Sequence, residues 1–248
     1  MLLSPEEWQV ISLSLKIASW CVAVAILPAL AMAWVLARCD FFGKTLLNTF
    51  VHLPMVIPPV VTGYFLLVLL GRNGIIGKWL YTVFDITLIF TWKGAVIATA
   101  VMAFPLMVRS IRTGIEALDP RLEDAAAMLG KDRSTTFLTI TLPLIFPALI
   151  SAFTLGFARA LGEFGATITF VSNIPGETRT LPIAIYSLLQ IPGGEDKVFR
   201  LVIVSLILSF AALAYSPNLW INASIELMTV GSPGAACSAP WARSINSS

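Results

Sequence analysis

Charged side chains are scarce in this sequence. Only 12% of its 248 residues are Asp, Glu, Lys or Arg, and 57% are hydrophobic, whereas soluble domains carry about 25% charged residues. Because so few charged groups cannot cover the surface of a water-soluble globular protein, the composition indicates a protein that is embedded in a lipid membrane. The formal net charge is only +2 and no basic patch stands out, so we expect no nucleic-acid partner.

Histidine and cysteine are too few for a metal centre. His52 is the only histidine, and the three cysteines lie far apart without a metal-ligand spacing or a disulfide framework. Hydrolase motifs such as G-x-S-x-G and H-E-x-x-H are missing. Residues 71–78 superficially resemble a phosphate-binding loop, but the spacing is one residue too long and Trp79 replaces the required Ser or Thr. We therefore expect no catalytic residue, no metal and no cofactor bound by this chain.

Five apolar runs have the length of membrane spans, which need about 20 residues. The runs are residues 17–36, 50–70, 94–108, 134–158 and 201–225. The third is short and is extended by Thr91 and Trp92. The first is longer than a signal-peptide core and follows Glu6 and Glu7 rather than basic residues, so we interpret it as a true span. The predicted fold class is an all-α membrane protein with about five transmembrane helices.

A short amphipathic helix is predicted over residues 120–129. Asp119 and Pro120 are typical of an N-cap and a first helical position, apolar residues recur at helical spacing, and Gly130 is a typical C-cap. From the residues alone, this helix fits either a helix lying on the membrane surface or a helix that docks into another protein.

The second apolar run contains Pro54, Pro58, Pro59 and Gly63. Proline removes a backbone donor and kinks a helix, and broken helices are tolerated in membranes only where protein or a water-filled cavity satisfies the freed groups. Transporters use such breaks along the substrate path. We therefore predict a discontinuous helix that lines a translocation pathway, and a purely structural kink is the alternative.

Two residues of opposite charge, Arg159 and Glu163, come directly after the fourth apolar run, and Phe164 and Gly165 follow them. Arg159 and Glu163 are four residues apart, so on a helix they share a face and can pair. Arg159 lies sixteen residues after Pro143, about 24 Å along a helix axis, which places the pair deep in the membrane. Either the pair locks or gates the pathway, or Arg159 attracts an oxyanion. We favour the lock because Glu163 neutralises Arg159.

A signature of the form D-A-A-x3-G-x9-I-x-L-P resembles the EAA motif of permease subunits of binding-protein-dependent ABC transporters. In that family the motif is a cytoplasmic helix that docks into a separate ATPase subunit, and Asp124 here replaces the usual Glu. The resemblance implies the following ATPase-coupling residues: Glu123, Asp124, Ala125, Ala126, Gly130, Ile140, Leu142 and Pro143.

Three further stretches, residues 52–64, 160–170 and 173–182, resemble the molybdate and sulfate branch of these permeases. The last looks more like the molybdate permeases. The resemblance implies a multi-pass inner-membrane permease that imports molybdate and is not itself an enzyme. It implies a homodimer with two ATP-binding subunits, which use the ATP, and with a periplasmic oxyanion-binding protein. Sulfate or tungstate as the substrate, and a self-sufficient ion-coupled carrier, are the alternatives.

The resemblance also predicts topology, which the charges of the loops do not decide. The coupling motif must be cytoplasmic, so five spans place the N-terminus outside and the C-terminus inside. In the outer loop, residues 181–191 form an apolar piece that we expect to lie at the outer membrane surface. Residues 1–215 are predicted to form the permease domain. Residues 217–248 lose the permease pattern and are predicted to be an atypical, disordered tail.

Overall fold

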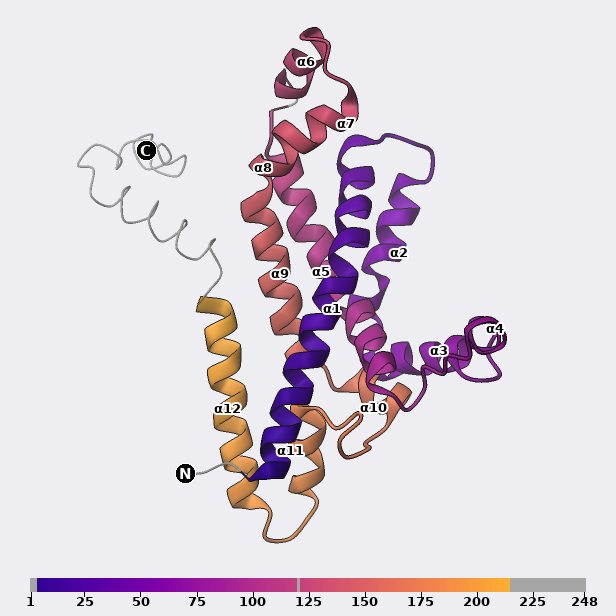
Figure 1. The fold of residues 1–248 in the computed structure, drawn as a ribbon, viewed down its shortest axis with the longest axis vertical. Helices are drawn as coiled ribbons and strands as arrows, with labels where there is room; N and C mark the ends of the chain where they lie inside the picture. Colours follow the sequence, from indigo (N-terminus) through magenta and orange to yellow (C-terminus); the bar gives the residue numbers. More distant parts are fainter. Residues whose placement is uncertain (1–3, 120, 215–248) are drawn as a thin grey trace, which may run out of the picture.

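The computed structural model describes residues 4–119 and 121–214, and every regular element in this part of the chain is a helix. Figure 1 shows an elongated bundle with the long helices along its axis, α6 at one end, α11 at the other, and α3 and α4 projecting sideways. The helices are α1 (Pro5–Arg38), α2 (Lys44–Val56), α3 (Pro59–Leu70), α4 (Ile75–Phe84), α5 (Trp92–Glu116), α6 (Arg121–Met128), α7 (Arg133–Thr136), the π-helix η1 (Phe137–Thr141), α8 (Leu142–Leu144), α9 (Phe146–Leu161), α10 (Gly165–Val171), α11 (Leu181–Leu189) and α12 (Glu195–Ala214).

The all-α membrane fold is confirmed, and its spans are less regular than the apolar runs suggest. Among the described residues, α1 and α5 are each long and apolar enough to cross a membrane. Two further pairs are long and apolar enough to span a membrane only when the two members are taken together. These are α2 with α3, bent by 112°, and η1–α8 with α9, bent by 57°. The fifth expected run, 201–225, begins in α12 and continues beyond the described residues, as does the expected tail.

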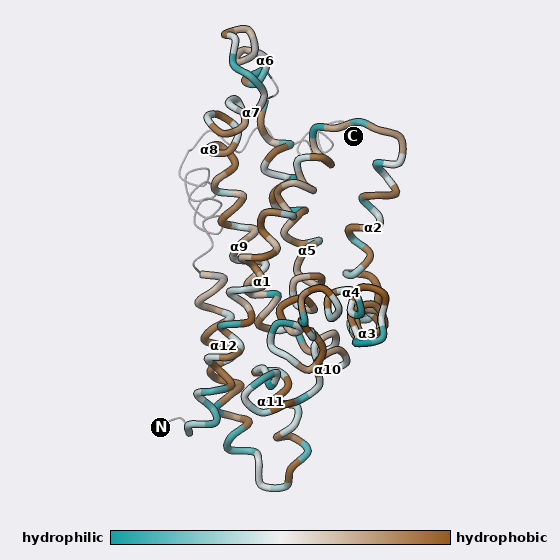
Figure 2. The backbone as a smooth tube through the Cα atoms, turned by 45° about the vertical axis from the view of Figure 1, so that its right-hand side comes forward, coloured by the Kyte–Doolittle hydropathy of each residue, from teal (hydrophilic) through white to brown (hydrophobic). Residues whose placement is uncertain are grey.

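The centre of the bundle is built from small side chains. Ala18, Cys21, Ala25 and Ala29 recur every three or four residues along α1 and are buried with side chains of α5 and α9. Small residues let membrane helices approach closely, and close packing is what holds them together when lipid is as apolar as the core. Figure 2 shows that the long helices are predominantly hydrophobic, whereas the hydrophilic segments lie mainly at the two ends of the bundle and in the loops.

The end opposite α6 is held by polar contacts between distant parts of the chain. Arg200 of α12 pairs with Glu7 of α1, with Nη2 2.9 Å from Oε1, and the Ser14 hydroxyl accepts a hydrogen bond from the Leu181 amide at 2.8 Å. The expected helix over 181–191 is present as α11. Its buried Leu181 and Ala184 pack with residues of α1 and α12, so α11 is part of the bundle rather than an isolated surface helix.

Gly114 of α5 lies directly against Ala148 of α9. A Cβ atom added there would lie 2.3 Å from the Cβ atom of Ala148, which cannot move away without moving its helix. We predict that Gly114→Leu lowers the free energy of unfolding by about 1–3 kcal/mol, the usual cost of overpacking, seen as a lower unfolding temperature of the purified protein. The control is Thr113→Leu at the neighbouring exposed position. Equal stability of the two variants would contradict the packing.

Candidate coupling and translocation sites

The predicted amphipathic helix is confirmed as α6, which stands alone at one end of the bundle (Figure 1). The Asp119 carboxylate accepts a hydrogen bond from the Arg121 amide at 3.0 Å, as expected of a residue that caps a helix start. At the other end Gly130 has a φ of +78°, and the Lys131 amide donates to the Ala126 carbonyl at 3.1 Å. This six-residue closure is a Schellman motif, so both ends of α6 are fixed by local chemistry.

One carboxylate attaches α6 to the rest of the protein. Glu123 Oε1 lies 3.0 Å from Nη2 of Arg38, at the C-terminal end of α1, and accepts a hydrogen bond from the Thr141 hydroxyl at 3.3 Å. Glu123 therefore joins α6 to both α1 and η1. Glu123 was predicted as a coupling residue, whereas its two partners were not, because Arg38 lies far away in sequence and Thr141 occupies a variable position of the motif.

The larger apolar side chains of α6 point away from the bundle. Ala126 is buried, whereas Leu122, Met128 and Leu129 are exposed, Met128 and Leu129 by 89% and 82%. We call these three residues the apolar tip. Ala125 is exposed as well, and Asp124 lies in the same helix. An exposed apolar cluster of this kind is typical of a surface that another protein or the membrane covers.

The second half of the motif lies directly below α6 and is not regular α-helix. Ile140 belongs to the π-helix η1, closed by a hydrogen bond from the Leu142 amide to the Phe137 carbonyl, and Pro143 follows in α8. Trp34 of α1 packs edge-on against Phe137, with ring centroids 4.8 Å apart. Single π turns occur frequently at functional sites. The expected continuous span over 134–158 is therefore interrupted here and again at the 57° bend before α9.

The predicted discontinuity in the second run is present and is larger than a kink. α2 ends at Val56, α3 begins at Pro59, and the two axes differ by 112°. α3 packs on α10, and a Cβ atom on Gly63 would lie 2.6 Å from the Ala166 carbonyl oxygen. A Cβ atom on Gly165 would meet Pro59 at 2.7 Å. The fold thus brings Pro59, Gly63 and Gly165 together from two predicted pathway segments, beside Pro58 at the break. Pro54 lies within α2, before the break.

The predicted ion pair is confirmed, but the continuous helix expected to carry it is wrong. α9 ends at Leu161, so Arg159 in the last turn of α9 pairs with Glu163, which lies in the break between α9 and α10. Glu163 is buried, and its Oε1 atom accepts a hydrogen bond from the Ala166 amide at 2.9 Å. The Glu163 carboxylate therefore neutralises the Arg159 charge and also accepts a hydrogen bond from the Ala166 amide, which the break leaves without a helical partner. Phe164 packs against Tyr186 of α11, with ring centroids 5.0 Å apart.

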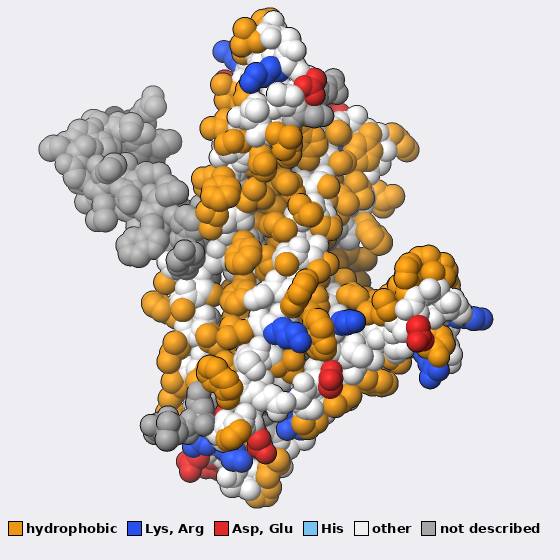
Figure 3. Space-filling view, in the orientation of Figure 1, with side chains coloured by type: hydrophobic (Ala, Val, Ile, Leu, Met, Phe, Trp, Pro, Cys, Tyr) orange, Lys and Arg blue, Asp and Glu red, His pale blue; other side chains and the backbone are white. Residues whose placement is uncertain are grey.

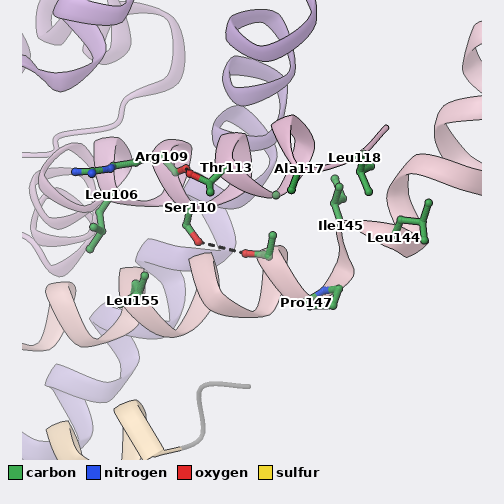
Figure 4. Close-up of a pocket in the computed structure, with 12 residues that line it drawn as sticks. Leu106, Arg109, Ser110, Thr113, Ala117, Leu118, Leu144, Ile145, Pro147 and Leu155 are labelled. Carbon is green, nitrogen blue, oxygen red and sulfur yellow. Dashed lines mark hydrogen bonds between the residues drawn. The ribbon is translucent and has the colours of Figure 1, made fainter. Parts of the chain in front are cut away.

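A surface groove of about 540 Å³ runs between α5 and the α8–α9 segment, in the half of the bundle nearer α6 (Figure 4). Its lining is mainly apolar, with Arg109, Ser110 and Thr113 as polar members. The Ser110 hydroxyl donates a hydrogen bond to the Ala148 carbonyl at 3.5 Å across it. None of the predicted coupling or pathway residues lines this groove.

Comparison with known proteins assigns the chain to a family. Residues 26–226 match the model of the binding-protein-dependent transport system inner membrane component. This chain belongs to that family of multi-pass inner-membrane proteins.

The chain is 55% identical to the molybdenum transport system permease protein ModB of Escherichia coli K12 over 216 residues, covering 87% of this chain and 94% of the relative. Identity to ModB of Haemophilus influenzae is 50%, covering 89% and 95%. The sulfate transport system permease protein CysT of Escherichia coli K12 is more distant, at 40% over 65% of this chain and 58% of the relative.

Solved structures support the fold. A bacterial alginate ABC transporter in complex with an alginate-bound periplasmic protein superposes with a TM-score of 0.69 at 16% identity, covering 86% of this chain and 77% of that chain. The MetNI methionine ABC transporter gives 0.62 at 13% identity, covering 86% and 92%. The described helices therefore have the arrangement of an ABC transporter permease.

The Arg159–Glu163 pair can be tested for its role in stability. We predict that Glu163→Gln destabilises the purified protein by up to about 3 kcal/mol, because it removes the charge partner of the partly buried Arg159. The double variant Arg159→Gln with Glu163→Gln should be more stable than this single variant. Thermal unfolding in detergent would measure both. A double variant no more stable than Glu163→Gln would contradict the pairing energy.

Proposed function

We propose that this chain is the transmembrane permease subunit of an ATP-driven importer of molybdate. The observation that carries the proposal is α6, an isolated helix with an exposed apolar tip that coincides with the EAA-like motif. The 55% identity to a molybdenum permease over nearly its whole length supports molybdate. Sulfate is the less favoured substrate because the similarity to the sulfate permease is lower and covers less of both chains.

The ATPase in this proposal is a separate subunit that binds the apolar tip of α6. Two copies of the permease assemble with two ATPase subunits, and a periplasmic binding protein delivers the oxyanion at the opposite end. When the ATPase subunits close, they move α6. The Glu123 contacts with Arg38 and Thr141 then transmit the movement to α1 and η1 at the same time. The permease itself makes and breaks no covalent bond.

The two helix breaks form the gate in this proposal. α3 and α10 touch through glycines, so small rotations of either segment change the contact without displacing large side chains. The Arg159–Glu163 pair fixes the closed arrangement, because separating it exposes a buried carboxylate and frees the Ala166 amide. Both carboxylate oxygens of Glu163 have partners within the chain, the Ala166 amide and the Arg159 guanidinium.

Co-purification and transport test the function together. The permease is expressed with its candidate ATPase and binding protein, and we expect the ATPase to co-purify and vesicles to take up molybdate only with ATP and the binding protein. Met128→Asp and Leu129→Asp should each weaken ATPase binding about 30-fold, as expected for a contact worth about 2 kcal/mol.

Leu189→Asp, at an exposed apolar position on the opposite end, is the matched control and should retain the ATPase. ATPase binding unaffected by the tip variants would show that α6 is not the docking helix. Uptake of sulfate in preference to molybdate would replace the proposed substrate and leave the permease assignment intact.

Topology gives an independent prediction. Exposed Lys131 lies shortly after α6 and exposed Glu177 lies before α11 in the chain, and Figure 1 shows these two helices at opposite ends of the bundle. After replacement of Cys39 and Cys237, a cysteine at Glu177 should react with a membrane-impermeant thiol reagent in intact spheroplasts. A cysteine at Lys131 should react only after permeabilisation. The reverse pattern would place α6 outside, where no ATP is available.

A further inference from the structure

The segment formed by α3, residues 71–74 and α4 projects from the side of the bundle (Figure 1), and we call it the arm. α4 packs on α3 and has few buried side chains of its own, since only Gly77 is buried within it. Ile75, Trp79, Val83 and Phe84 are each more than half exposed. The arm therefore leaves an apolar helix face without a partner in the protein chain.

The two faces of α4 differ sharply. At 3.6 residues per turn, the exposed Ile76, Trp79 and Val83 lie within about 60° of one another around the helix. Lys78, Tyr81 and Thr82 occupy an arc of about 100° on the other side. Arg72 stacks over the Tyr81 ring, 4.8 Å from its centroid, and donates a hydrogen bond to its hydroxyl at 3.2 Å. Among the described residues, neither Arg72 nor Lys78 pairs with a carboxylate. Both cations are thus available on the polar side of the arm.

The polar and apolar sides of the arm are ordered along the axis of the bundle. Figure 3 shows hydrophobic side chains gathered on the side of the arm that faces the α6 end, and charged side chains at its tip and lower side. α1 and α5 run along this axis and are the helices that can cross a membrane. The apolar face of the arm is therefore directed toward the membrane interior and its charges toward the nearer aqueous phase.

The position of the arm along that axis matches a membrane boundary. α5 has 25 residues, about 37 Å of helix, which only slightly exceeds the hydrocarbon thickness of about 30 Å. Its first residue, Trp92, must then lie near one boundary, and Lys16 stands over the Trp92 ring at 3.9 Å. Tryptophan and lysine together are typical of the interface. Residues 85–91 join α4 to this point, so the arm lies at the same boundary.

We propose that α4 is an interfacial helix that lies in the membrane leaflet opposite the α6 end. Its apolar face enters the acyl chains, and Arg72 and Lys78 contact the phosphates of lipid headgroups. An amphipathic helix with aromatic residues on one face and cations on the other binds lipid in this way, and the apolar α3 connects it to the bundle through the same leaflet. The arm would then fix the outer end of the 112° break while the α6 end moves.

Nitroxide accessibility tests the proposal on the full chain in lipid nanodiscs of phosphatidylethanolamine and phosphatidylglycerol. After replacement of Cys39 and Cys237, labels are placed by Val83→Cys on the apolar side and by Thr82→Cys on the polar side of α4, adjacent exposed positions about 100° apart around the helix. Collision rates are measured with oxygen, which concentrates among acyl chains, and with a neutral nickel chelate, which stays in water. We expect the ratio of oxygen to nickel collisions to be several-fold higher at 83 than at 82.

Two results would overturn the proposal. An immobile label at 83 that neither reagent reaches, together with a short distance between labels of two protomers, would mean that a second copy of the chain covers α4. Frequent nickel collisions at both positions would mean that α4 is in water. The measurement needs neither the ATPase nor a substrate, so its failure would leave the proposed transport function untouched.

Discussion

Every break in a membrane helix leaves backbone groups that lipid cannot satisfy, and the architecture of this protein depends on how two such breaks are closed. The α2–α3 break and the α9–α10 break come together because Gly63 and Gly165 let the two backbones touch. The buried Glu163 carboxylate then binds the freed Ala166 amide on one side and the Arg159 guanidinium on the other. Glu163 thus closes the α9–α10 break, and the two glycines join that break to the one between α2 and α3.

This junction is mechanically connected to the α6 end through one segment of chain. α9 begins just after the π-helix that contacts Glu123 through Thr141, and it ends two residues before Glu163. Under the proposed function, a displacement of α6 is therefore transmitted to the gate by α9, a regular helix preceded by two irregular and more flexible segments. The π turn and the 57° bend are these segments, because neither has the regular hydrogen-bond pattern that makes an α-helix stiff.

Features set by neighbouring residues could be predicted from the sequence. α6 was found with both caps, because Asp119 and Gly130 act through local backbone chemistry, and the prolines of the second run located the first break. The motif resemblance indicated the family. The 112° direction of the bend, the contact of α3 with α10 and the inward position of the Glu123 carboxylate could not be predicted, since each depends on residues far away in sequence. The end of α9 at Leu161 was missed because its i, i+4 ion pair also fits a continuous helix.

Two Arg–Glu pairs, Arg38–Glu123 and Arg200–Glu7, tie distant segments near the two ends of the bundle, and the pair Arg159–Glu163 joins residues four apart at the α9–α10 break. The Glu7 and Glu163 side chains are only 4% and 2% exposed, whereas the Glu123 side chain that holds α6 is 26% exposed. Breaking a buried pair leaves a desolvated charge and is costly, while water screens and solvates a partly exposed pair. Under the proposed function, water can solvate the partly exposed Glu123 carboxylate when α6 is displaced, whereas Glu7 and Glu163 would lose their partners in buried positions.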